Sequence, residues 1–138
     1  MAFITESGEL SVGVKMLDCD HREMSQAIHD LHAATMQDRS LTGPLLRRLT
    51  DFTLTHFALE EGMMHATKYP GIALHRLHHQ YLIGELKALI ACHQQKDSAL
   101  TPSLLRSLSA WHAEHVHQDD MHYGIWLNQS GRCYHSLP

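Results

Sequence analysis

The sequence predicts an all-α protein, an up-down-up-down antiparallel four-helix bundle preceded by an extended N-terminal arm. Four long segments repeat apolar residues at three- and four-residue steps, which is typical of helices with one buried face. The links between these segments are short and rich in helix breakers, and no segment shows the apolar–polar alternation of a strand. Four rods of similar length joined by short links pack most simply as an antiparallel bundle.

The arm and the first helix occupy the amino-terminal part of the chain. Residues 1–17 show no helical period and are expected to form the arm. The first helix is predicted over residues 18–38, where Asp18 or Asp20 is placed to cap its first turn. Its inner face is predicted to carry His21, Met24, Ile28, Leu31 and Thr35.

The second helix is predicted over residues 43–67, with Pro44 in its first turn. Its inner face is predicted to carry Leu45, Leu49, Phe52, His56, Leu59 or Glu60, and Met63. The sequence Tyr69-Pro70-Gly71 then stops the helix and forms a turn.

The third and fourth helices are predicted over residues 71–95 and 101–123, with Thr101 and Pro102 starting the fourth. The third is predicted to bury Ile72, His75, His79, Leu82, Leu86 and Leu89. The fourth is predicted to bury Leu104, Leu108, Trp111 and His115. Residues 124–138 are expected to form a tail.

The composition limits the class of protein. The 138 residues suit one domain over residues 1–138, and 43% hydrophobic residues suffice for a core without disulfides. The net charge of -4 with no basic block argues against nucleic acid as a partner. The chain shows no leader and no apolar run of about 18 residues, so we expect a cytoplasmic protein without membrane contact. Its cysteines, Cys19, Cys92 and Cys133, are widely spaced and are expected to be reduced thiols.

Histidine is the unusual feature of the composition, with 14 residues. Five of these interrupt the apolar inner faces of all four predicted helices: His21, His56, His75, His79 and His115. A buried polar side chain without a partner costs about 1–3 kcal/mol, and a whole domain is stable by only about 5–15 kcal/mol. A ligand shared by all five imidazoles removes this difficulty.

The spacing of the histidines favours a metal ion as the shared ligand. A lone histidine on an apolar face is more often a hydrogen-bonded core residue, so the argument depends on the whole set. His75 and His79 lie one helical turn apart, as do His56 and Glu60, and each pair can chelate one ion. Imidazole and carboxylate ligands without thiolate suit iron, manganese or zinc. Seven such side chains are too many for one ion and suit two ions bridged by carboxylates.

Spacing alone does not decide which carboxylate accompanies His115. Asp119 lies one turn further on, as chelation from a regular helix requires. Asp120 lies about 140° around a regular helix from His115, so it would need a longer reach or a local bulge.

Four sequence segments between residues 9 and 123 resemble the hemerythrin family. They are VGVKMLDCDH (12–21), HFALEEGMM (56–64), YPGIALHRLHH (69–79) and WHAEHVHQDDMHY (111–123). Together they are similar to the family pattern H…HxxxE…HxxxH…HxxxxD. The resemblance implies the metal ligands His21, His56, Glu60, His75, His79, His115 and Asp120. It favours Asp120 over Asp119 because the family places a tyrosine three residues later, where Tyr123 stands.

The resemblance also implies a chemistry. His75, His79 and His115 would hold one iron ion, and His21 and His56 the other. Two carboxylates and an oxo or hydroxo group would bridge the ions, leaving one coordination position open. O2 would bind there reversibly as hydroperoxide. The implied cofactor is two iron ions, and the implied partners are O2 and small anions. Whether an oxidase or a signalling protein is also a partner is left open.

Two positions depart from the family. Glu9-Leu10 replaces a tryptophan that is frequent near the arm, so we expect weaker docking of the arm. His112 stands where related proteins carry an apolar residue, often leucine. We expect His112 either to reach the open position, as a hydrogen-bond donor or a ligand, or to turn toward solvent or Glu114.

The remaining residues are expected to be structural. The aromatic and apolar residues Trp111, Phe52, Phe57 and Leu82 should pack in the core, with some of them, Trp111 included, lining the metal cavity. Glu61 is expected either behind a ligand or at the surface, and the surface is somewhat favoured. The other histidines are expected to be mostly solvated: His29, His32, His65, His78, His93, His117, His122 and His135. Glu114 and His117 form a lone ExxH, whereas the ferritin-like diiron pattern needs two such pairs.

The function predicted first is O2 binding for carriage, storage or delivery, without enzymatic turnover. The alternatives are an oxygen or redox sensor that cycles between diferrous and diferric states, an enzyme that handles peroxide or nitric oxide, and a metal buffer. His112 is the one feature that favours the enzyme.

Overall fold

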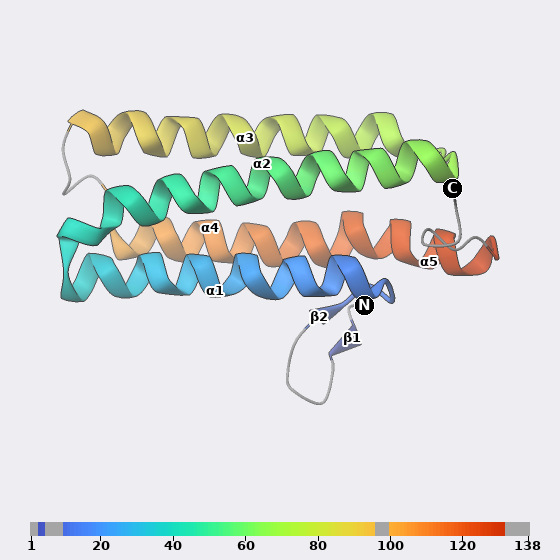
Figure 1. Ribbon diagram of the computed structural model, residues 1–138, viewed down its shortest axis with the longest axis horizontal. Helices are drawn as coiled ribbons and strands as arrows, with labels where there is room; N and C mark the ends of the chain where they lie inside the picture. Colours follow the sequence, from blue (N-terminus) through green and yellow to red (C-terminus); the bar gives the residue numbers. More distant parts are fainter. Residues whose placement is uncertain (1–2, 5–9, 96–99, 132–138) are drawn as a thin grey trace.

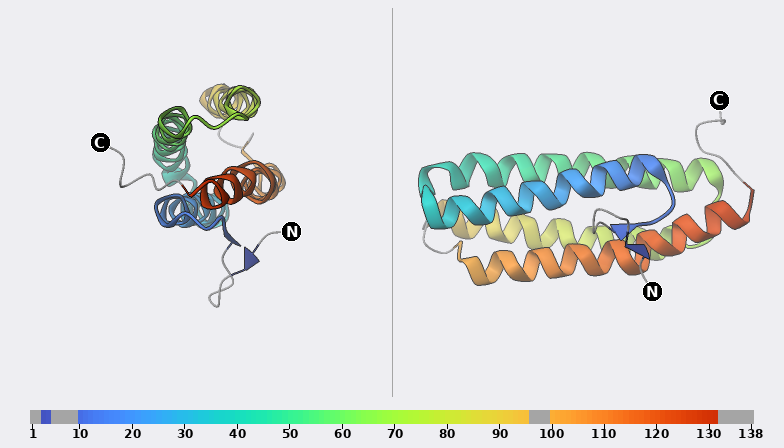
Figure 2. Two further views of the ribbon diagram at one scale, coloured as in Figure 1. Left: turned by 90° about the vertical axis from the view of Figure 1, so that its right-hand side faces the viewer. Right: turned by 90° about the horizontal axis from the view of Figure 1, so that it is seen from below.

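Four long helices lie side by side and alternate in direction in the computed structural model, and Figure 1 shows them lengthwise. The structure describes residues 3–4, 10–95 and 100–131. The helices are α1 (Lys15–Gln37), α2 (Thr42–Thr67), α3 (Ile72–Gln95) and α4 (Pro102–His115). Seen from the end in Figure 2, they surround a common centre, with α1 against both α2 and α4. The predicted antiparallel bundle is confirmed.

The arm that precedes α1 contains two short antiparallel strands, β1 (Phe3–Ile4) and β2 (Leu10–Ser11). Helix α1 begins at Lys15, before the predicted start, and Val14 precedes it without a side-chain cap. The prediction that Asp18 or Asp20 caps this helix is therefore wrong. Asp18 instead accepts hydrogen bonds from the Ser11 hydroxyl at 2.7 Å and the Val12 amide at 2.8 Å, so it ties the arm to the bundle.

The fourth helix continues beyond residue 123, which corrects the predicted tail. After α4 comes a five-residue π-helix, η3 (Val116–Asp120), and then α5 (Met121–Gln129). Gly124 on α5 lies directly against the arm, because a Cβ atom there would overlap the Val12 carbonyl oxygen. The arm thus docks closely through Val12, whereas Glu9 lies outside the described residues. Residues 132–138 of the predicted tail also lie outside them.

The inner face of α4 differs from the prediction. Leu104, expected in the core, is 43% exposed, whereas Leu105, His112 and His115 are buried. Residues 105, 108, 112 and 115 follow the three- and four-residue steps of one helical face as regularly as the predicted set does. The packing of α4 against α1 decides between the two faces, and it turns His112 inward.

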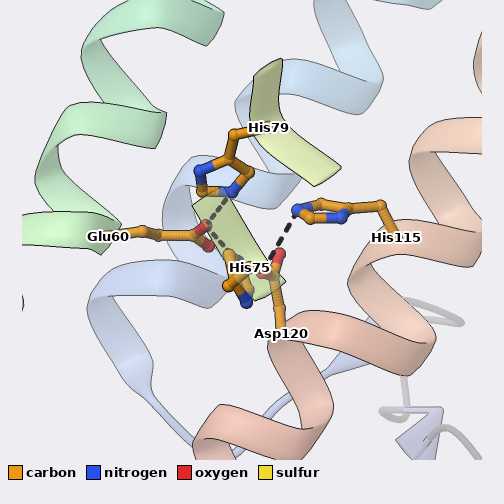
Figure 3. A group of neighbouring side chains, drawn as sticks. All are labelled: Glu60, His75, His79, His115 and Asp120. Carbon is orange, nitrogen blue, oxygen red and sulfur yellow. Dashed lines mark hydrogen bonds and ion pairs between the residues drawn. The ribbon is translucent and has the colours of Figure 1, made fainter. Parts of the chain in front are cut away.

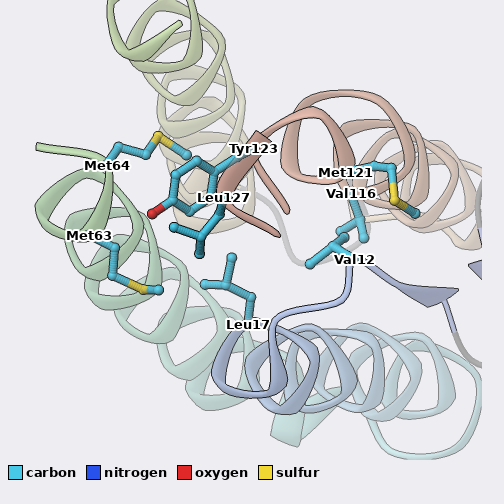
Figure 4. Close-up of a cluster of buried hydrophobic side chains, with 8 residues drawn as sticks. All are labelled: Val12, Leu17, Met63, Met64, Val116, Met121, Tyr123 and Leu127. Atoms are coloured by element: carbon cyan, nitrogen blue, oxygen red, sulfur yellow. The ribbon is translucent and has the colours of Figure 1, made fainter. Parts of the chain in front are cut away.

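The apolar core has two parts with a polar segment between them. The part at the α5 end, drawn in Figure 4, contains Val12, Leu17, Met63, Met64, Val116, Met121, Tyr123 and Leu127. The part at the opposite end contains Ile28, Leu31, Leu46, Leu49, Leu86, Leu100 and Leu105. The buried histidines lie along the helices between these two parts. Among the described residues, no helix has the length and hydropathy needed to cross a bilayer.

Candidate metal centre

The seven side chains predicted as metal ligands meet in the centre of the bundle, and none is more than 5% exposed. They form two groups that share both carboxylates. The five-residue group, drawn in Figure 3, consists of Glu60, His75, His79, His115 and Asp120. The four-residue group consists of His21, His56, Glu60 and Asp120. Within each group the possible ligand atoms lie within 4.8 Å of one another.

Glu60 extends from α2 with one oxygen toward each group. Its Oε1 lies 3.0 Å from His79 Nε2, and its Oε2 lies 3.0 Å from His56 Nε2. The carboxylate therefore has the orientation of a bridge between two neighbouring ions.

Asp120 is oriented in the same way from the opposite side. Its Oδ1 lies 2.9 Å from His75 Nε2, and its Oδ2 lies 2.9 Å from His21 Nε2. Two ligand atoms bound at right angles about 2.1 Å from one ion lie about 3.0 Å apart. The observed separations are those of atoms that share an ion.

Most of these atoms lack hydrogen bonds, apart from His75 Nε2 and Glu60 Oε1, which are hydrogen-bonded to each other at 3.3 Å, and this tests whether a metal fits. Four inward Nε2 atoms and three carboxylate oxygens are buried without a hydrogen-bond partner among the described residues. They belong to His21, His56, His79, His115, Glu60 and Asp120. Seven such atoms in one place would be a large cost to the fold unless cations satisfied them. The donor set and its orphaned atoms therefore fit two metal ions.

Carboxylates behind the site hold three of the histidines by the opposite ring nitrogen. Asp20 lies 2.8 Å from His56 Nδ1, and Glu61 lies 2.8 Å from His79 Nδ1. Such a partner accepts a hydrogen bond from the Nδ1–H group and leaves the Nε2 lone pair directed inward. Of the two places expected for Glu61, the structure shows the one behind a ligand, because α3 packs against α2 at this point. Asp20, expected as a helix cap, was missed in this role.

Asp119 and Asp120 serve the same site from two sides. Asp119 lies 2.8 Å from His115 Nδ1, whereas Asp120 contributes to both groups. The π-helix η3 widens the turn between His115 and Asp120. It is the kind of local bulge that Asp120 was expected to need in order to reach the site together with His115. Asp119 also lies 2.8 Å from His78 Nδ1. His78, expected to be solvated, is therefore partly buried and connected to the site.

Charge pairing dominates the electrostatics of the site. Burial alone would lower the pKa of His21 and His75, but the carboxylates of Asp120 and Glu60 outweigh it and raise both to about 10. Burial would raise the pKa of Asp120, yet the surrounding histidines lower it to about 2. In the metal-free site His21 and His75 therefore hold protons, which metal binding would displace.

Aromatic rings and an apolar cavity border the site. Phe57 stacks on His79 with ring centroids 3.8 Å apart, and Trp111 is parallel to His115 at 5.6 Å. A cavity of about 20 Å³ beside the rings has mainly apolar walls. Its lining residues are Met24, Ile28, Leu49, Thr53, Phe57, Leu82, Leu86, Leu108, Trp111 and His112.

His112 points into the bundle and is 6% exposed. The ring centroid of His112 lies 6.2 Å from that of His21. Burial and then the neighbouring His21 lower the pKa of His112 to about 4. The alternative in which His112 turns toward solvent is wrong.

The other predictions have mixed outcomes. His29, His65 and His122 are exposed, whereas His32, His93 and His117 are partly buried. His135 lies outside the described residues. The free thiols predicted at two positions are confirmed, since Cys19 and Cys92 are unpaired and exposed. Cys133 also lies outside the described residues.

The fold and the site define a class of protein, a four-helix bundle whose core brings together five histidines and two shared carboxylates that could hold metal ions. The family model described as "Hemerythrin HHE cation binding domain" matches residues 12–127. The chain belongs to the hemerythrin family.

Known members of the family resemble the chain over most of its length. It is 30% identical to a bacteriohemerythrin of Stenotrophomonas maltophilia, covering 99% of this chain and 92% of that protein. It is 28% identical to a myohemerythrin of Sipunculus nudus, covering 79% of this chain and 81% of that protein. A wild-type hemerythrin crystal structure superimposes with a TM-score of 0.79 and 25% identity, covering 88% of this chain and 95% of that one.

Proposed function

We propose that the protein binds O2 reversibly at a pair of iron ions, for carriage, storage or delivery rather than turnover. The observation that carries the proposal is the unequal division of the ligands. Five side chains surround one metal position and four surround the other, while both carboxylates belong to each group. An ion at the position with four side chains would have fewer protein ligands and could take a small exogenous ligand.

The residues assigned to each ion follow from this division. His75, His79 and His115 would hold the first ion, and His21 and His56 would hold the second. The two carboxylates shared by the groups would bridge them. When bound, two ferrous ions supply the electrons with which O2 is bound reversibly.

The chain itself supplies geometry and a dry environment. The outer carboxylates fix the ring orientation of three ligand histidines, which keeps the inward nitrogens available. The cavity of about 20 Å³ is close to the size that a single water molecule needs, and an apolar cavity of this kind stays dry. Exclusion of water favours release of an intact ligand over side reactions.

The proposal is tested by reconstituting the protein with ferrous iron under anaerobic conditions and then admitting O2. We expect two iron ions per chain and a charge-transfer absorption band that disappears on degassing and returns on re-exposure. The variant His79→Ala should lose the band, because it removes a ligand of the five-residue group. The matched control His65→Ala should keep it, because His65 is exposed at the end of α2.

Two outcomes would contradict the proposal. One is oxidation to the diferric state without a reversible band, which would favour a redox sensor. The other is protein purified from iron-replete cells with two zinc ions, which would favour metal buffering.

A further inference from the structure

His112 is a buried imidazole whose polar atoms have no hydrogen bond within the part of the chain that the structure describes. Its ring is 6% exposed, lines the apolar cavity and faces His21 edge-on at 6.2 Å. Glu114, the nearby acid considered as a partner, is exposed on another face of α4.

The position of His112 relative to the ligands distinguishes two roles. His112 belongs to neither group of ligand atoms that lie within 4.8 Å of one another. Two nitrogen ligands bound about 2.1 Å from the same ion are at most about 4.2 Å apart. As placed, His112 is therefore not one of the side chains that could bind either ion directly together with its whole group.

His112 lies beside the four-residue group, which has fewer protein ligands than the other group. Its ring neighbour is His21, a member of the four-residue group. Most of the cavity wall beside it is apolar, and the hydroxyl of Thr53 in that wall already donates to the Leu49 carbonyl at 2.7 Å. A neutral imidazole offers one N–H donor and one acceptor nitrogen, so His112 can donate to a lone pair on a ligand in the cavity.

We propose that His112 is a ligand-binding residue that donates a hydrogen bond to a small anion or diatomic molecule held at the four-residue group. The inference rests on the proposed function, since it requires an ion with an open position. According to this proposal, the side chain at position 112 on α4 makes a polar contact with the bound ligand, where an apolar side chain would only extend the apolar wall of the cavity.

The experiment measures azide binding to the diferric protein by absorbance titration, with the azide stretching frequency as a second readout. His112→Leu introduces an apolar side chain of similar size and removes the donor, whereas His112→Gln keeps a donor. A hydrogen bond to a charged group corresponds to about a 10- to 100-fold change in affinity. We expect His112→Leu to weaken azide binding by this factor and to shift the stretching frequency, and His112→Gln to retain most of the affinity.

The controls separate this inference from the proposed function. His29→Gln changes an exposed histidine on α1 and should leave azide affinity unchanged. Failure of the unmodified protein to hold two irons or to bind azide would overturn the proposed function itself. Equal azide affinity of the unmodified protein and His112→Leu, with two irons in each, would overturn only the role of His112. Loss of one iron in both His112 variants would also overturn it, because His112 would then be a metal ligand.

Discussion

Replacement of Asp20 by asparagine is expected to weaken one of the two metal positions and to spare the other. The Asp20 carboxylate lies 2.8 Å from His56 Nδ1, and its side chain is 24% exposed. The asparagine amide keeps one oxygen as an acceptor, and water can solvate the new NH2 group, so the fold should survive. What is lost is the negative charge that makes His56 a stronger ligand.

The size of the effect follows from the role of the outer carboxylate, and its location follows from the group to which the histidine belongs. Loss of such an outer partner typically lowers metal affinity about 10- to 100-fold, which is about 1.4–2.7 kcal/mol. His56 belongs only to the four-residue group, so Asp20→Asn should act there. Glu61 lies 2.8 Å from His79 Nδ1, so Glu61→Gln should act on the five-residue group instead.

The assay is a zinc titration of metal-free protein against a coloured chelator, which gives a dissociation constant for each of two ions. Asp20→Asn should weaken one binding step and Glu61→Gln the other. Asp30→Asn is the matched control, because Asp30 lies on the same helix but accepts a hydrogen bond from Gln26 at the exposed surface. The reasoning is refuted if Asp20→Asn and Glu61→Gln weaken the same step, or if neither differs from the control.

Three further predictions concern the fold and the metal-free site. Gly124→Ala should destabilise the protein by about 1–3 kcal/mol in urea unfolding, because its Cβ would overlap the Val12 carbonyl oxygen; an unchanged midpoint would mean that the arm does not dock there. Phe57→Ala should cost about 3–5 kcal/mol in metal-free protein, because the ring is fully packed against a ligand histidine; a loss below about 1 kcal/mol would contradict this packing. In metal-free protein the raised pKa values of His21 and His75, both about 10, give stability that is complete below about pH 6.5 and is lost as the pH rises toward 10. Urea midpoints between pH 6 and 10 should therefore fall, and a rise across this range would falsify the assigned charge pairing.

Much of the fold and the inner ligand set could be predicted from the sequence. The stripe of His21, Met24 and Ile28 on the first helix, and the pair His75 and His79 on the third, depend only on the residue spacing of a helix. Such spacing identifies which side chains share a face before any tertiary contact is known. The same reasoning chose the wrong face near Leu104, because two faces of that segment were nearly equal in hydrophobicity.

The outer partners could not be predicted in the same way. Asp20 and His56 are 36 residues apart, and Glu61 and His79 are 18 apart, so neither pairing is contained in one helix. Each depends on how two helices are rotated against each other, which is set by packing of the whole core. Spacing within one helix cannot report that rotation.

The sequence by itself determined the helical bundle, the histidines on its inner faces and, through the family pattern, the seven candidate ligands. Tertiary structure decided that Asp119 and Asp120 both serve the site through a π-turn, and that His112 points inward. The physical reason is that helix periodicity is a local property of the chain. The phase of one helix relative to the next, by contrast, is fixed only when all the side chains pack together.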